Sequence, residues 1–164
     1  MGRISALIAA LVLLVGGSAA AQSPMQAFSP PGGRFSIMMP GTPQSSSNPI
    51  KQTNGDTTTA YKFWVETDGG SIVYMVMYND DPSPQSSAQG RLMASRDGVV
   101  KSAKATLLSD RITDLNGVPG RIYSMRGTED GYNWDVASYY QGRRLYRSSP
   151  SARPARPPST ATPT

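Results

Sequence analysis

Two neighbouring stretches decide the fold: TTTAYKFWVET at residues 57–67 and SIVYMVMYN at residues 71–79. The first alternates between two faces that differ in polarity, which is typical of a β-strand with one buried face. One face carries Thr59, Tyr61, Phe63 and Val65, and the other carries Ala60, Lys62, Trp64 and Glu66. The second stretch is apolar on both faces, so we predict a central strand covered on two sides. The DGG at residues 68–70 predicts a tight turn between them.

A strand that is apolar on both faces needs a covering layer, and residues 86–104 are the best helical candidate. Small and apolar residues recur there at helical spacing: Ala88, Leu92, Ser95, Val99 and Ala103. Arginine, lysine and aspartate fill the other side of the helix. Gly98 is a weak point in the middle of this helix.

The remaining pattern predicts an antiparallel meander. Residues 105–115 turn at Asn116-Gly117 into residues 118–126, and residues 129–131 turn into residues 132–140. Asn-Gly tolerates positive φ and suits a type I′ hairpin. Residues 143–146 then begin a strand that stops after four residues. Together with a first strand at 34–40, this order predicts an α+β fold with a mostly antiparallel sheet.

Three segments are expected to lie outside regular structure. Residues 22–32 are rich in Ser, Pro and Gly and are interpreted as a linker, and residues 42–56 are interpreted as a loop. Residues 148–164 contain five Pro, four Ser and two Arg, a composition that predicts a disordered tail. This tail is either a native spacer or the product of a reading-frame error that replaces a last strand and helix.

The N-terminus has the pattern of a secretory signal peptide. Arg3 supplies a positive charge, residues 4–15 form a short apolar run, and Ala19-Ala20-Ala21 precedes Gln22 as a cleavage site. A transmembrane helix needs about 20 apolar residues, more than this run contains. We therefore predict cleavage between Ala21 and Gln22, a mature domain over residues 33–147, a periplasmic or secreted location, and no transmembrane span in the mature chain.

Composition excludes several classes of function. The sequence has no cysteine, which excludes disulfides, thiol chemistry and a lipid-attachment cysteine. The formal charge is +5, but residues 22–146 carry 12 Lys and Arg against 11 Asp and Glu, a net of +1. Because the cationic residues are scattered among acidic ones, we do not expect nucleic-acid binding.

The absence of histidine removes the commonest general base and metal ligand, so Ser-His-Asp and zinc sites are excluded. We assign no catalytic residue and expect no cofactor and no metal. Asp80 and Asp81, or the cluster Glu129, Asp130, Asn133 and Asp135, could offer oxygens to Ca²⁺. Neither has the spacing of a calcium loop, and solvated turn residues are the simpler interpretation.

Aromatic residues offer either a core or a binding face. Exposed Trp and Tyr beside Arg are the residue types that dominate protein interfaces. The residues proposed on this basis for a partner surface are Trp64, Trp134, Arg121 and Arg126.

Five short phrases together carry a family resemblance: GRFSIMMPGTP at 33–43, YMVMYND at 74–80, ASRDG at 94–98, GVPGR at 117–121 and GRRLY at 142–146. This series resembles small exported bacterial proteins of the PsbP-like superfamily, over residues 33–146. The resemblance implies an α/β/α sandwich around an antiparallel sheet and a non-enzymatic role in binding or assembly. After Arg147 the sequence departs from the family pattern, which continues the strand and closes with an amphipathic helix.

Two functions follow from these observations. The first is an exported, non-catalytic binding or assembly accessory protein of the cell envelope, whose partner is an unknown envelope protein. The second is an envelope hydrolase or small-ligand-binding protein that uses carboxylate, Tyr and Arg residues. A flat aromatic face would favour the first, and a carboxylate pair in a closed pocket would favour the second.

Overall fold

The computed structural model describes residues 24–51, 55–82 and 87–152, of which 61% lie in strands and 15% in helix. The elements in chain order are β1 (Met25–Phe28), β2 (Ile37–Pro40), β3 (Gln44–Lys51), β4 (Thr57–Thr67), the 3-10 turn η1 (Asp68–Gly70), β5 (Ile72–Asp80), α1 (Ala88–Ser102), β6 (Ala105–Leu115), β7 (Val118–Gly127), β8 (Asn133–Gln141) and β9 (Arg144–Ala152). The predicted signal peptide, its cleavage site and residues 153–164 of the predicted tail lie outside the described residues.

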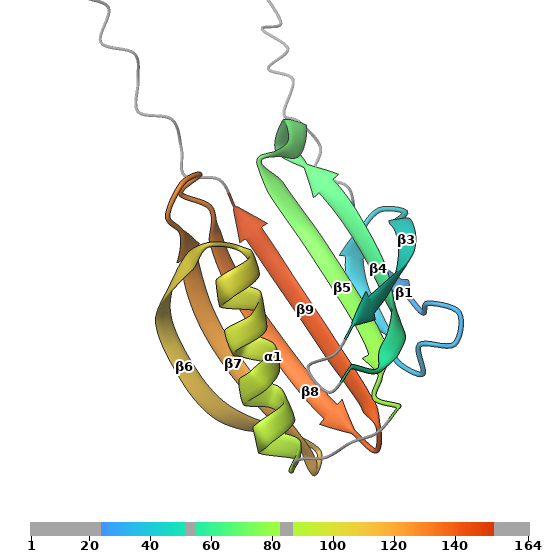
Figure 1. Cartoon of the computed structure of the whole chain (residues 1–164). Helices are drawn as coiled ribbons and strands as arrows, with labels where there is room; N and C mark the ends of the chain where they lie inside the picture. The colour runs from blue at the N-terminus through green and yellow to red at the C-terminus, as the bar shows by residue number, and fades with distance from the viewer. Residues whose placement is uncertain (1–23, 52–54, 83–86, 153–164) are drawn as a thin grey trace, which may run out of the picture.

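Seven strands form one antiparallel sheet in the order β3-β4-β5-β9-β8-β7-β6. The predicted hairpin of β4 and β5 is confirmed: Phe63 pairs with Val76, and Tyr61 pairs with Tyr78. The last strand, β9, enters between β5 and β8 and joins the two halves of the sheet (Figure 1).

Helix α1 covers one face of the sheet over β6, β7 and β8 (Figure 1). Its N-terminus is capped by Ser87, whose Oγ accepts a 3.1 Å hydrogen bond from the Gly90 backbone N–H. Leu92 is fully buried against Tyr140 and Leu145. Nearer the C-terminus, the helix packs on a second cluster: Val99, Val100 and Ala103 against Tyr123, Met125 and Val136. The predicted helix and its inward positions Leu92, Val99 and Ala103 are therefore confirmed.

The opposite face carries the small sheet of β1 and β2 rather than a helix. Phe28, Phe35 and Ile37 of this N-terminal segment pack on a cluster in the sheet that contains Phe63, Val76, Tyr78 and Tyr146. The predicted fold class, α+β with a flanking helix in an α/β/α sandwich, is therefore wrong. The molecule is mostly β, with one helix on one face and a hairpin on the other.

Three expectations about irregular segments also need correction. The predicted linker at 22–32 contains β1, which pairs with β2, and the predicted loop at 42–56 contains β3, which pairs with β4. Both strands are mostly exposed; β1 is only four residues long and β3 is polar, so neither shows the apolar alternation by which strands are recognised. Their structure comes from backbone pairing with stronger neighbours.

The third correction concerns β9, which runs through Ser148–Ala152 where a disordered tail was predicted. Hydrogen bonding to β5 on one side and β8 on the other holds this Ser-rich segment in the sheet. Pro150 lacks a backbone N–H, and the β8–β9 pairing breaks between Trp134↔Ser151 and Ala137↔Ser148, beside that residue. The break accommodates a proline in a central strand.

Candidate functional site

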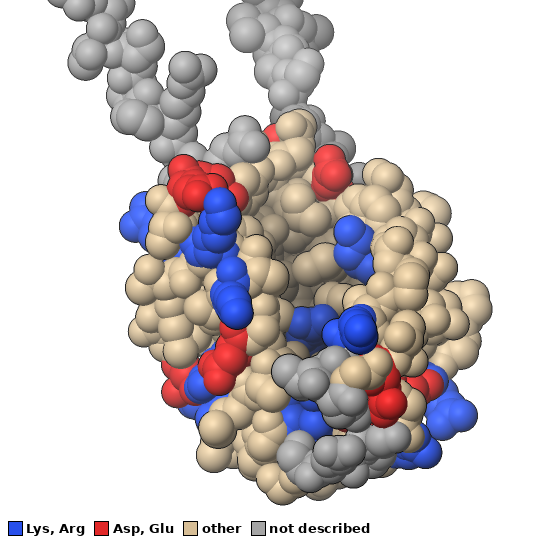
Figure 2. All heavy atoms as spheres, viewed as in Figure 1, with Lys and Arg blue, Asp and Glu red and all other residues tan. Residues whose placement is uncertain are grey.

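A groove lies on the helix-bearing face, between α1 and the uncovered part of the sheet. Figure 2 shows the surface hollowed there, with Lys or Arg atoms inside the hollow. The groove has a volume of about 310 Å³. It is lined by residues of β5, α1, β7, β8 and β9: Met75, Met77, Val99, Ser102, Ala103, Met125, Trp134, Val136, Arg147, Ser148 and Ser149.

The groove exists because a single helix cannot cover the whole face of a seven-stranded sheet. Helix α1 lies over β6, β7 and β8, so β5 and β9 extend beyond it. Met75 and Met77 of β5 point to the helix side and remain only half-buried. The apolar second face of β5 that the sequence predicted to be covered thus forms the floor of the groove. Methionine side chains are flexible and adapt to different ligand shapes.

Arg147 places a positive charge within this apolar lining. In the strand register it lies opposite Met77 of β5 and Ser138 of β8, on the face of β9 that also carries Leu145. Its Nε atom is buried and has no hydrogen-bond partner among the described residues. Burial lowers the pKa of the Arg147 guanidinium, Tyr123 partly offsets this shift, and Arg91 adds to it.

The other arginines on this face are paired with carboxylates. Arg91 binds Asp81, and Arg96 binds Asp97 and Asp110. Arg121 is buried, and its Nε lies 3.2 Å from Oδ1 of Asp110. Arg147, in contrast, has no carboxylate partner among the described residues. The groove therefore holds a cation that these residues do not pair with an acid.

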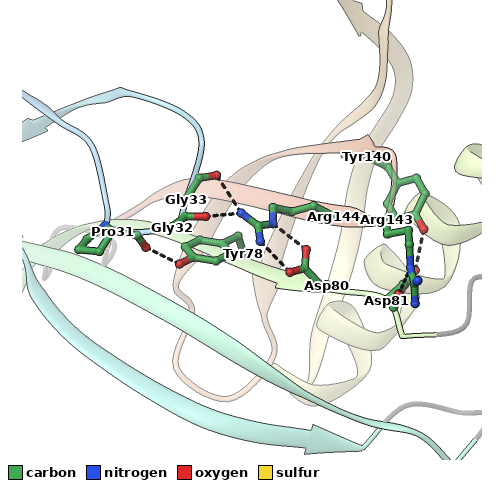
Figure 3. Close-up of polar contacts among 9 residues, drawn as sticks. All are labelled: Pro31, Gly32, Gly33, Tyr78, Asp80, Asp81, Tyr140, Arg143 and Arg144. Carbon is green, nitrogen blue, oxygen red and sulfur yellow. Dashed lines mark hydrogen bonds and ion pairs between the residues drawn. The ribbon is translucent and has the colours of Figure 1, made fainter.

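A second polar cluster surrounds Asp81 at the end of β5 (Figure 3). The Asp81 side chain is 1% exposed; Arg91 donates two hydrogen bonds to its two oxygens, and the Tyr140 hydroxyl donates a third at 2.9 Å. Arg143 Nε donates to the Asp81 carbonyl at 2.7 Å, and the Asp81 backbone N–H donates to the Arg143 carbonyl at 2.6 Å. Burial raises the pKa of Tyr140, and the hydrogen bond to Asp81 raises it further. This cluster ties the start of α1 to β8.

Asp80 is engaged separately by Arg144, with two bonds of 2.6 Å (Figure 3). These bonds hold the pKa of Asp80 below its usual range. Arg144 also donates to the carbonyls of Gly32 and Gly33, and its guanidinium lies 4.7 Å from the ring centre of Tyr78. The two weak calcium candidates, Asp80 and Asp81, thus serve as ion-pair partners that fix the loop before β2 and the helix.

The structure separates the four residues predicted to form a partner surface. Trp134 lines the groove. Trp64 lies on β4, where the Lys62 ammonium is 4.5 Å from its ring centre. Arg121 is buried, whereas Arg126 is exposed on the opposite face, since it neighbours Met125 in an alternating strand. Trp64, which pairs with Met75, therefore shares the helix-bearing face with Trp134, whereas Arg121 is buried and Arg126 lies on the other face.

Sequence reasoning does not identify Arg147, because the predicted strand covers only residues 143–146. The signal was the alternation itself: Leu145, Arg147 and Ser149 share one face if the strand continues. An arginine in line with a buried leucine then points beneath or beside the helix.

Comparison with known proteins gives little further information. No protein-family model matches the chain, and no curated protein matches it either. Among solved structures, the chain is similar to PA94 from Pseudomonas aeruginosa, a protein of unknown function. The two are 11% identical with a TM-score of 0.44, over 79% of this chain and 83% of PA94. No helix within the described residues is long and apolar enough to cross a membrane.

Proposed function

We propose that this chain is a non-catalytic binding protein of the cell envelope, and that it holds an apolar ligand in the groove between α1 and β5. The observation that carries the proposal is the groove itself, about 310 Å³ lined mostly by Met, Val and Trp side chains. Small-molecule sites are concave, largely apolar and of this order of size, with a few polar groups that set orientation. The predicted signal peptide supports a periplasmic or secreted location.

Within this proposal, the methionines make a deformable floor and the helix makes a fixed wall. Met75, Met77 and Met125 approach the ligand from β5 and β7. Val99 and Ala103 approach it from α1, which is held in place by Leu92 and by the Asp81 cluster. A wall that is anchored independently of the ligand lets the groove exist before the ligand binds.

Fluorescence of Trp134 provides the test, because Trp134 lines the groove and the sequence has only one other tryptophan. In a Trp64→Phe background, titration with the neutral apolar dye Nile red should quench Trp134 and enhance dye emission. Ser102→Phe, which fills the groove from α1, should abolish both changes. Lys101→Phe places the same ring on the neighbouring exposed position, which does not line the groove, and should leave both intact.

The proposal fails if Nile red leaves Trp134 unchanged, or if the two phenylalanine variants behave alike. In the second case the dye would be binding elsewhere on the apolar surface.

A further inference from the structure

We propose that the ligand of this groove is a single-chain amphipathic carboxylate, whose carboxylate pairs with Arg147 and whose alkyl chain lies along the methionines of β5. This inference rests on the proposed function, because it names the ligand class for the same groove.

The first step is the charge at Arg147. Arg147 is half-buried, and its buried Nε atom has lost hydration that no hydrogen bond replaces, which costs free energy. Its Nε has no hydrogen-bond partner among the described residues, and none of the described residues that line the groove is acidic. An anion that enters the groove would supply the missing partner, and it would meet no like charge on the lining.

The second step is the chemistry of the anion. A guanidinium presents its donors in a planar fork that matches the two oxygens of a carboxylate. The same geometry occurs elsewhere in this molecule. Arg91 donates two hydrogen bonds to the Asp81 carboxylate, and Arg144 donates two to the Asp80 carboxylate. The Arg147 guanidinium could bind a carboxylate in the same way, but the described residues supply none.

The third step is the shape of the apolar part. From Arg147 the lining continues along β5 and α1 as Met77, Met75, Val99 and Ala103, and ends at Trp134 on β8. A volume of about 310 Å³ suits one extended alkyl chain rather than a two-chain lipid or a helical peptide. The charged group and the apolar path thus lie in one continuous groove.

The test compares three probes of equal chain length: decanoate, the neutral decanol and the cationic decyltrimethylammonium. Binding is followed by Trp134 fluorescence in the Trp64→Phe background and by calorimetry. Decanoate should bind at least about tenfold more tightly than decanol, which corresponds to about 1.4 kcal/mol. The cationic probe should bind most weakly. Acidification that protonates the carboxylic acid, with a pKa of about 4–5 like that of a glutamate side chain, should abolish the preference.

Two variants at position 147 and one control localise the effect. Arg147→Met keeps an unbranched apolar stem and removes the charged guanidinium, so decanoate and decanol should bind equally. Arg147→Lys keeps the charge without the fork and should retain part of the preference. Arg126→Met makes the same substitution on the exposed opposite face and should leave the preference unchanged.

The outcomes separate this inference from the proposed function. If decanol and decanoate bind wild type equally, or if Arg147→Met keeps the full preference, the inference is wrong while the groove remains an apolar binding site. If neither decanoate, decanol nor Nile red binds wild type, both proposals fail.

Discussion

The Tyr140 hydroxyl donates a 2.9 Å hydrogen bond to Oδ2 of Asp81, although 59 residues separate them in the sequence. Arg91 grips the same carboxylate through two bonds, so one buried charge joins the end of β5, the first turn of α1 and the end of β8. Because α1 forms one wall of the groove, this contact also positions the candidate site.

Asp81→Asn should lower the free energy of unfolding by about 3–5 kcal/mol, because it leaves the Arg91 guanidinium without its counter-charge. Tyr140→Phe removes one hydrogen bond to a charged acceptor and should cost about 1.5–3 kcal/mol. Urea unfolding followed by circular dichroism measures both. Asp97→Asn is the matched control, since the Asp97 side chain is 63% exposed in its pair with Arg96, and it should cost at most about 1 kcal/mol. An equal loss in the two aspartate variants would contradict a buried role for Asp81.

Ionisation of Tyr140 should weaken the fold at alkaline pH. Burial and Asp81 raise the folded-state pKa of Tyr140 above its ordinary value of about 10, so the folded state holds the proton more tightly than the unfolded state. The corresponding stability is complete below pH ~10 and is lost as the pH rises through the folded pKa. The melting temperature measured from pH 8 to 12 should fall less steeply in Tyr140→Phe than in wild type. Parallel curves would show that Tyr140 does not contribute to this pH dependence.

Two glycines should respond to alanine with opposite signs, although neither has an atom within 4 Å of the added Cβ. Gly98 has an ordinary helical position in α1, so Gly98→Ala should stabilise by about 1 kcal/mol. Gly117 has a φ of +84° in the turn after Asn116, so Gly117→Ala should destabilise by about 1–2 kcal/mol. Thermal unfolding of the two variants decides this, and a change of the same sign in both would contradict the assigned backbone geometry.

Alanine at Gly120 of β7 should also destabilise the protein, but through a steric clash of its Cβ rather than through backbone strain. A Cβ there would lie 2.6 Å from the ring of Tyr139 and 2.9 Å from Cγ2 of Thr113. Gly120→Ala should therefore cost about 1–3 kcal/mol through overpacking. Tyr139→Ala in the same chain should remove most of that added cost, because it vacates the clashing position, so a double-mutant cycle measures the coupling. If the losses of stability in the two single variants simply add in the double variant, the clash does not involve Tyr139.

The sequence predicts correctly those elements whose side chains show a clear periodic pattern. β4, β5 and α1 carry strong alternation or helical spacing, and the Asn116-Gly117 turn has the positive φ values, 52° and 84°, that its residues favour. β3 and the end of β9 are held by backbone pairing, which leaves no periodic signal in polar or Ser-rich sequence. The sandwich prediction is wrong for a related reason. The layer that covers the second face is the short N-terminal hairpin, which packs on the sheet through Phe28 and Phe35. Part of this hairpin has the composition of a linker.

The candidate site was less accessible to sequence reasoning. Trp134 lines the groove, and its role in contacting a partner stays a prediction. Arg147, however, is a candidate binding residue only because it lies in an apolar groove. That position depends on the order of the strands, since β9 lies between β5 and β8, beside the edge of α1. No local pattern specifies that order.

The cost of leaving Arg147 without a partner should be measurable in the absence of ligand. Arg147→Met replaces a half-buried cation, whose Nε has no hydrogen-bond partner among the described residues, by an unbranched apolar side chain like those of its neighbours Met75 and Met77. Removing the cation also removes the desolvation cost at Nε, so the variant should melt at a higher temperature than wild type. Decanoate in excess should raise the melting temperature of wild type by mass action and leave that of the variant much less changed. A variant that melts below wild type without ligand would mean that Arg147 stabilises the fold itself, and its charge would then be a structural feature rather than one kept for binding.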